Sequence, residues 1–418
     1  MNRRNFLKAA GFAGLSLTSP FNFTRSHASE TGYDGLFFIL VNANGGWDPT
    51  SFCDPKGRVD ENETNPMNMY FKGDIRTAGN INFAPVPGVQ EFFEKYYERL
   101  LVINGVDTST NGHDSGVRHV WSGSLGEGHP AFSSLVAANL GAERPLSFLS
   151  FGGYDDTRGL IAPTRTGNVG ALERIAYPQR QNPSDENSMF HSSATQERIK
   201  RALAARTQRK LEKETLSIKR QALGNLVLAR AGENEIARLT EYLPDLDNSP
   251  NQLRRQAQLA IAAYKAGVCV SANLNVGGFD THGDHDNRHF GSLRNYFEGV
   301  DFLLQEAERQ GVADKVVVAM GSDFGRTPGY NAQNGKDHWS ITSMMFAGAG
   351  IRGNRVIGST TERHRPINVD AQSLQPSESG VRITPAHIHH SMRELAGINQ
   401  MSLTQRYPLS VQPLNLFA

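Results

Sequence analysis

The stretch Val276-Gly-Gly-Phe-Asp-Thr-His-Gly-Asp-His-Asp286 decides the fold of this chain. It follows an apolar run over residues 267–274, whose length and β-branched content predict a buried strand. Two glycines end that strand, and Asp280 and His282 follow two residues apart, so in an extended backbone both side chains leave on the same side. A carboxylate and an imidazole placed in this way suit a divalent cation, although a polar turn alone would explain the same residues.

Other strand ends carry matching residues. Apolar runs over residues 35–43, 99–106 and 315–321 predict central strands of a parallel sheet, because they are apolar on both faces. The candidate ligands that follow these runs are Asp48, His113 and Asp323, with His338 in a later polar loop. Ligands of open α/β sheets bind at the carboxyl ends of the strands, so we expect these side chains to share one edge and to hold one or two divalent metals.

Helical segments separate the predicted strands. Residues 192–265 are rich in Ala, Leu and Arg with apolar residues at 3–4 spacing, which predicts an all-helical insertion. Its basic first helix is interpreted as a solvated face, with docking of an acidic partner as the alternative. The last helix is predicted to begin at Thr384-Pro-Ala-His, and we expect His387, His389 and His390 on its surface.

The N-terminus predicts export. Residues 1–8 contain an Arg pair followed by Phe-Leu-Lys, a weakly apolar segment comes next, and Ser26-His-Ala28 offers a cleavage site. We therefore expect residues 1–28 to be a signal peptide for the twin-arginine export machinery and the mature protein to be periplasmic or extracellular. No later run reaches about 18 apolar residues, so no membrane span is expected in the mature chain.

The composition excludes several classes of protein. The 43 Lys and Arg residues almost cancel the 42 Asp and Glu residues, so the overall charge gives no reason to expect binding to nucleic acid or to an anionic membrane. Two cysteines, Cys53 and Cys269, exclude a disulfide scaffold and a Cys-based zinc cluster. They could pair in an oxidising compartment, but Cys269 in an apolar strand is more simply a buried hydrophobic residue.

Three motifs in order resemble a known family. Gly-Gly-Phe-Asp280-Thr-His282, then Ser-Asp323-Phe-Gly-Arg-Thr and then Gly-Lys-Asp-His338-Trp are similar to DUF1501, a branch of the alkaline phosphatase/sulfatase superfamily. The resemblance implies an alkaline-phosphatase-like α/β sandwich over residues 29–418, with a mainly parallel central sheet flanked by helices. It also implies a metal held by Asp280, His282 and His338, with His285 as an alternative ligand, and a second metal held by Asp48 and Asp323.

The resemblance leaves the nucleophile open. The superfamily places Cys, Ser or Thr at the start of a helix, where this chain has His113. Ser115, Thr110 or Asp114 could replace it, His113 could itself form a phosphoryl-enzyme, or a metal-bound water could attack. Arg326 or Lys336 would stabilise the developing charge.

Two functions follow from this reasoning. The first is a periplasmic hydrolase of phosphate or sulfate esters that depends on one or two divalent ions, with zinc favoured over manganese, calcium or magnesium. Its substrate would be a small or polymer-linked anionic ester. The second is a non-catalytic, metal-stabilised binding or assembly protein of the cell envelope on the same fold.

Overall fold

The computed structural model describes residues 33–165, 174, 177–182, 185, 187–231, 239 and 241–417. The predicted signal peptide at residues 1–28 lies outside them. Within the described residues, no helix is long and apolar enough to cross a membrane.

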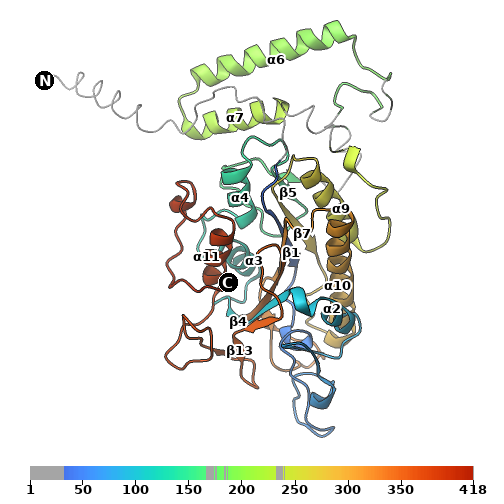
Figure 1. Ribbon diagram of the computed structural model, residues 1–418, viewed down its shortest axis with the longest axis vertical. Helices are drawn as coiled ribbons and strands as arrows, with labels where there is room; N and C mark the ends of the chain where they lie inside the picture. The colour runs from blue at the N-terminus through green and yellow to red at the C-terminus, as the bar shows by residue number, and fades with distance from the viewer. Residues whose placement is uncertain are drawn as a thin grey trace, which may run out of the picture. The chain divides into compact units, whose positions relative to one another are not determined.

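An eight-stranded sheet forms the centre of the fold (Figure 1). In spatial order its strands are β12 (Arg355–Ile357), β4 (Leu100–Asp107), β11 (Ile341–Gly348), β8 (Val316–Ser322), β1 (Phe37–Ala43), β7 (Ser271–Val276), β5 (Phe148–Ser150) and β6 (Thr164–Arg165). All neighbouring strands pair in parallel except β11, which runs antiparallel to both β8 and β4. The sheet is thus mainly parallel, as expected, and the predicted strands at 35–43, 99–106 and 315–321 are confirmed as β1, β4 and β8.

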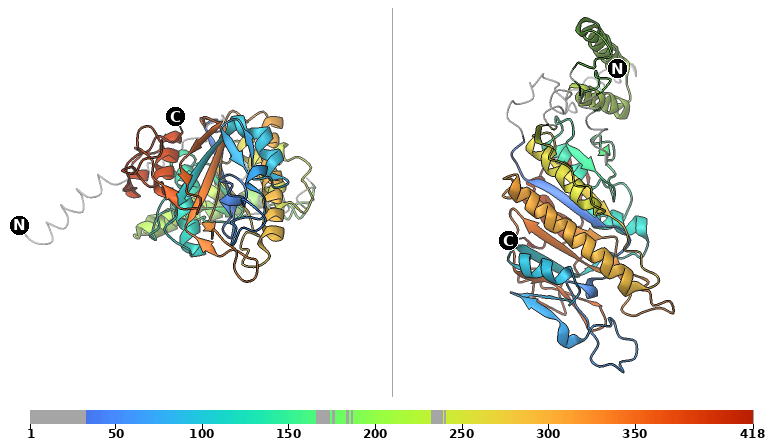
Figure 2. Two further views of the ribbon diagram at one scale, coloured as in Figure 1. Left: turned by 90° about the horizontal axis from the view of Figure 1, so that it is seen from below. Right: turned by 90° about the vertical axis from the view of Figure 1, so that its right-hand side faces the viewer.

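Helices cover both faces of the sheet. Alternating side chains of β1 divide the core: Phe37, Ile39 and Val41 pack on one side, and Phe38 and Leu40 on the other. The first side is covered by α2 (Val89–Tyr96), α9 (Gln252–Lys265) and α10 (His285–Arg309). The second side is covered by α3 (His113–Ser122), α4 (Phe132–Leu140) and α11 (Pro385–Leu395). Figure 2 shows α9 and α10 side by side along the sheet.

Three short two-stranded sheets and four 3₁₀ turns lie outside the eight-stranded sheet in the described part of the chain. The small sheets pair β2 (Arg76–Ala78) with β3 (Ile81–Phe83), β9 (Gly325–Arg326) with β10 (His338–Trp339), and β13 (Ser359–Thr360) with β14 (Pro366–Ile367). The 3₁₀ turns are Pro49–Ser51, Lys72–Asp74, Tyr97–Arg99 and Thr404–Arg406. The β9–β10 pair matters most for the site, because it places His338 opposite Arg326.

The helical segment divides differently from the expected unit at 192–265. α6 (Ser193–Lys213) and α7 (Ser217–Ala231) contact each other, whereas α9 packs against β7 and α10. α9 belongs to the core because its residues Ala257 to Tyr264 are buried without interruption. The sequence could not show this boundary, since all three segments have helical periodicity.

Two other expectations concern burial. The expectation that the histidines of α11 lie on the surface was wrong for His389, which is completely buried, and for His387, which is 5% exposed. α11 packs against α3, and His389 Nε2 donates a hydrogen bond to the Val120 carbonyl at 2.8 Å. Cys53 and Cys269 are both free and buried, so they do not pair.

Candidate metal centre

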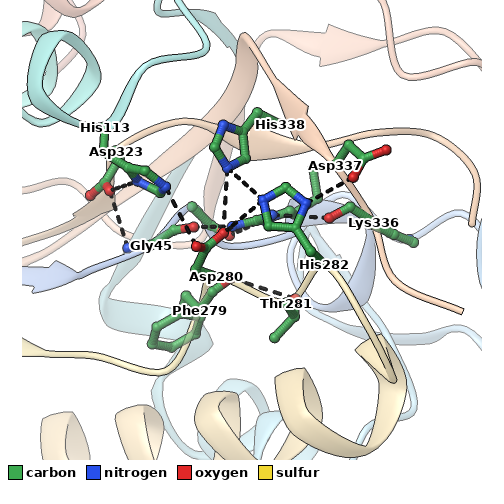
Figure 3. Close-up of polar contacts among 12 residues, drawn as sticks. Gly45, His113, Phe279, Asp280, Thr281, His282, Asp323, Lys336, Asp337 and His338 are labelled. Atoms are coloured by element: carbon green, nitrogen blue, oxygen red, sulfur yellow. Dashed lines mark hydrogen bonds and ion pairs between the residues drawn. The ribbon is translucent and has the colours of Figure 1, made fainter. Parts of the chain in front are cut away.

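Loops from several strands meet at the carboxyl edge of the central sheet (Figure 3). β1 leads into Gly45, which has a positive φ of 120° and leaves no room for a side chain, because a Cβ there would come 2.5 Å from Asp280 N. β8 leads into Asp323, and α3 begins at His113. The fold therefore brings together residues that are far apart in the sequence.

Three imidazoles converge on the carboxylate of Asp280. His282 Nε2 lies 3.1 Å and His338 Nε2 lies 3.3 Å from Asp280 Oδ1, and His113 Nε2 lies 3.7 Å from Oδ2. Ligand atoms of His113, Asp280 and His338 all lie within 4.8 Å of one another. The Asp280 side chain is 50% exposed, so this cluster is open to solvent. The sequence predicted each of these four residues as a site residue.

The other ring nitrogen of each imidazole is held by an oxygen atom. Nδ1 of His113 lies 2.8 Å from Asp323 Oδ2, and Nδ1 of His282 lies 2.8 Å from Asp337 Oδ1. Nδ1 of His338 lies 2.7 Å from the Asn111 carbonyl oxygen, which can only accept. Such contacts fix the ring orientation and favour the tautomer in which Nε2 is free to bind a ligand. Asn111 and Asp337 were not predicted in this role from the sequence, although Asp337 stands directly beside His338.

Asp323 orients His113 through the contact between Oδ2 and the Nδ1 atom of the imidazole. Its side chain is buried, and Oδ2 also accepts a hydrogen bond from Gly45 N at 3.1 Å. Its other oxygen, Oδ1, is buried without a hydrogen-bond partner. The hydrogen bond to Asp323 is the main cause of a raised pKa at His113.

Arg326 holds Asp280 in place. Its guanidinium is fully buried and donates to Asp280 Oδ1 at 2.7 Å, to the Gly46 carbonyl at 2.8 Å, to the Lys336 carbonyl at 2.9 Å and to the Gly45 carbonyl. Burial would raise the pKa of Asp280, but Arg326 outweighs it and the pKa is lowered. Because its guanidinium is buried and donates to Asp280 and to three backbone carbonyls, Arg326 positions Asp280.

Asp48 lies in a separate buried network. It is completely buried and accepts hydrogen bonds from Lys336 Nζ at 2.5 Å and from Thr50 and Ser51. His285, the alternative ligand, is also buried and lies 3.3 Å from Asp48. Burial would raise the pKa of Asp48, but Lys336 and His285 keep it well below its usual value. Asp48 therefore does not join the His113–Asp280–His338 cluster, because an ammonium group already occupies its carboxylate.

Ser115 also stands apart from the cluster. Its hydroxyl lies 2.6 Å from Thr110 Oγ1 and donates to the Gly112 carbonyl at 3.1 Å. Both partners belong to the loop before α3. The structure thus directs Ser115 and Thr110 to each other, and leaves His113 as the residue at the start of α3 that contacts Asp280 and Asp323.

The mainly parallel sheet, the flanking helices and the polar cluster at one edge define an α/β protein with a candidate metal site. A family model described as "Protein of unknown function (DUF1501)" matches residues 150–409, which is more than half of the chain. The chain therefore belongs to the DUF1501 family. A search of curated protein sequences finds no match.

Solved structures match the chain at low sequence identity and with TM-scores below 0.5. The chain is similar to the lipoteichoic acid synthase LtaP from Listeria monocytogenes, with 10% identity and a TM-score of 0.38 over 92% of this chain and 76% of that one. It is also similar to a 2-O GAG sulfatase, with 11% identity and a TM-score of 0.34 over 89% and 72%. Alkaline phosphatase from the Antarctic bacterium TAB5 matches with 10% identity and a TM-score of 0.37 over 88% and 100%.

Proposed function

We propose that this protein is a metal-dependent hydrolase of phosphate or sulfate esters. The observation that carries the proposal is the convergence of three Nε2 atoms, from His113, His282 and His338, on the Asp280 carboxylate. Imidazole nitrogens and carboxylate oxygens are the donors that zinc prefers in proteins, and three or four of them make one site. We therefore propose one ion at this cluster, with zinc as the first candidate.

The surroundings fit a metal better than an isolated polar cluster. Histidines that bind metals usually donate their second N–H to a carboxylate or a carbonyl, and all three imidazoles have such a partner. Asp323 contributes a buried oxygen, Oδ1, that no protein donor satisfies. A buried unpaired carboxylate oxygen is costly unless a cation or a donor lies near it, so a positive charge beside His113 would stabilise the arrangement.

When bound, a divalent metal would act as a Lewis acid toward an ester oxygen and neutralise negative charge. Neighbouring residues of the chain orient the side chains that would bind the metal. Arg326 orients Asp280, and Asp323 orients His113. The N-terminal end of α3 begins at His113, and the first-turn amides of a helix favour an anion. An anionic ester would therefore be preferred over a neutral one.

We propose water as the attacking group, because the two candidate hydroxyl groups, Ser115 and Thr110, form a hydrogen bond with each other instead of contacting the cluster. The alternative is a metal-stabilised binding protein without catalysis, and the absence of a hydroxyl or thiol among the described residues that contact Asp280 favours it. Turnover decides between the two functions. We further propose that the twin-arginine start, Arg3 and Arg4, directs export to the periplasm or beyond.

The test combines turnover with metal content. Zinc-loaded protein is assayed on aryl phosphate, aryl sulfate and a phosphodiester, beside Asp280→Ala, His338→Ala and Ser115→Ala. We expect Asp280→Ala and His338→Ala to lose both metal and turnover, because each removes a coordination bond, whereas Ser115→Ala stays within a few-fold of wild type. A dead Ser115→Ala variant that still binds metal would replace water with a serine nucleophile. Bound metal without turnover on any of the three substrates would favour the binding protein.

A further inference from the structure

We propose that α6 and α7 form a docking surface for a bilayer that contains anionic phospholipid. The two helices contact each other and are joined by residues 214–216, so they form an antiparallel hairpin, here called the basic hairpin (Ser193–Ala231; Figure 1). α6 has one buried residue among its 21, Thr207. A helix that is exposed over almost its whole length either lies in solvent or covers a partner.

The charge of the basic hairpin differs in sign from that of the rest of the chain. Residues 193–231 contain 10 Lys and Arg residues and 3 Asp and Glu residues, a net charge of +7. The remaining residues contain 33 Lys and Arg and 39 Asp and Glu, a net charge of −6. The near-neutral total of +1 therefore hides a strong separation of charge. A cluster of this size is attracted to anionic surfaces, and each Lys or Arg near an anionic bilayer adds to the attraction.

The basic hairpin also exposes apolar side chains. Of the 12 large hydrophobic residues exposed in the described part of the chain, five lie in the basic hairpin: Ile199, Leu203, Leu216, Ile218 and Leu226. Ile218 is 71% exposed and Leu216 is 54% exposed. A soluble polyanion would interact with the cations but would gain nothing from the exposed apolar residues. Exposed Ile and Leu beside Lys and Arg are typical of helices that lie in the interface of a bilayer, so the combination favours a membrane surface over an anionic polymer.

Cations and apolar residues meet in one cleft of the basic hairpin, about 760 Å³ in volume. Its charged lining consists of Arg206, Arg209, Lys210 and Lys213 of α6, Lys219 of α7 and one acid, Glu214, so five cations outnumber one carboxylate. Its apolar side includes Leu223 and Leu226 of α7. A cationic rim beside an apolar floor is complementary to a phosphate headgroup attached to an acyl chain. With ten cations in two helices, the hairpin would lie on the bilayer rather than cross it.

Vesicle flotation tests the docking surface with the full chain. We expect the protein to float with vesicles of phosphatidylcholine mixed with phosphatidylglycerol, and not with phosphatidylcholine alone. Rising ionic strength should weaken the binding, because exposed charges are screened. Arg206→Gln, Arg209→Gln, Lys210→Gln and Lys213→Gln together should reduce the binding constant by a factor on the order of 100 to 1000. A matched variant, Arg76→Gln, Arg158→Gln, Arg363→Gln and Arg365→Gln, removes the same charge elsewhere and should bind like wild type.

A second variant separates a bilayer from a soluble polyanion. Ile199→Ser with Leu203→Ser keeps every charge but removes exposed apolar surface from α6, so vesicle binding should fall several-fold while binding to heparin stays unchanged. Circular dichroism checks that each variant keeps its helices. Three results would overturn the proposal: no flotation with anionic vesicles, an equal loss of binding in both charge variants, or retention on heparin without binding to vesicles.

Discussion

Among single residues, the buried pair of Asp48 and Lys336 stabilises the loops that carry the metal cluster. Both side chains are inaccessible to solvent and lie 2.5 Å apart. The backbone of Lys336 donates to the Thr281 carbonyl at 3.1 Å and accepts from Arg326 at 2.9 Å. The backbone of Lys336 thus joins the segment before His338 to the loop after β7, and its side chain joins that segment to Asp48 after β1. Neither residue reaches the open cluster, so we assign them a structural role.

Removing one partner of this pair should be costly. Lys336→Met leaves a buried carboxylate at Asp48 without its ammonium, and we expect a loss of about 3–5 kcal/mol in the free energy of unfolding, measured by urea denaturation. Lys336→Met with Asp48→Asn should recover part of this loss, because no uncompensated charge remains. Lys72→Met, which breaks an exposed pair with Glu362, should change stability by less than about 1 kcal/mol. Equal effects of the two single variants would contradict the assignment.

The sequence predicted most residues of the site, but it did not show which of them lie in the open cluster around Asp280 and which lie in the buried network around Asp48. Asp280, His282, Asp323 and His338 follow strands in the pattern expected for one sheet edge. Asp48 satisfies the same pattern, yet it turns inward because Lys336 is available to neutralise it. A strand-end position predicts where a residue lies along the sheet, but not which partner its side chain selects. That choice depends on contacts between loops about 290 residues apart in the sequence.

At the scale of elements, the loop before β10 packs tightly against the loop after β7. A Cβ at Gly335 would lie 1.9 Å from the His282 carbonyl oxygen, so even an alanine must displace the backbone that carries His282. Gly329 lies in the same connection and has no atom within 4 Å of an added Cβ. The two glycines therefore offer a matched comparison of a crowded position with an open one.

Gly335→Ala should weaken metal binding without removing a ligand. We expect a loss of roughly 10–100-fold in zinc affinity, since misplacing a supported ligand has about the effect of deleting its support. Gly329→Ala should bind zinc like wild type. Competition with a chromophoric chelator measures both affinities. Equal affinities in Gly335→Ala and wild type would show that His282 does not take part in binding.

The packing of α11 on α3 predicts a dependence of stability on pH. Burial lowers the pKa of His389 from 6.5 to about 3, so the folded residue stays neutral while the unfolded residue takes up a proton as the pH falls below 6.5. The unfolded state then binds more protons, and the free energy of unfolding falls by about 1.4 kcal/mol per pH unit between these values. This contribution is absent above about pH 6.5.

His389→Gln should reduce that dependence. Gln can still donate to the Val120 carbonyl but does not titrate, so the difference in unfolding free energy between about pH 7 and about pH 5 should shrink by about 2 kcal/mol. Urea denaturation at the two pH values measures it. An unchanged difference would mean that His389 is not the titrating group. The sequence missed this burial because the helix shows histidines on several sides, and only the packing partner reveals which side is covered.

At the scale of the whole chain, the order of strands and helices was the most predictable feature. Apolar runs bounded by Gly and Asp identified β1, β4 and β8. The sequence could not show that β11 runs antiparallel to both β4 and β8, since its apolar run, Ile341–Gly348, resembles the apolar runs of the strands that pair in parallel. It also could not show that α9 covers the core while α6 stays exposed. The direction of a strand and the packing of a helix both depend on the neighbouring elements, which the local sequence does not specify.

We propose above that His113, His282, His338 and Asp280 hold one divalent ion. Elemental analysis of the purified, zinc-equilibrated and desalted chain tests it most directly, with His338→Ala and Ser115→Ala measured beside it. We predict one zinc ion per chain in wild type and in Ser115→Ala, and a large loss of zinc in His338→Ala, because this variant removes a donor from the cluster. A wild-type chain without metal, or a His338→Ala chain with undiminished metal, would contradict the account.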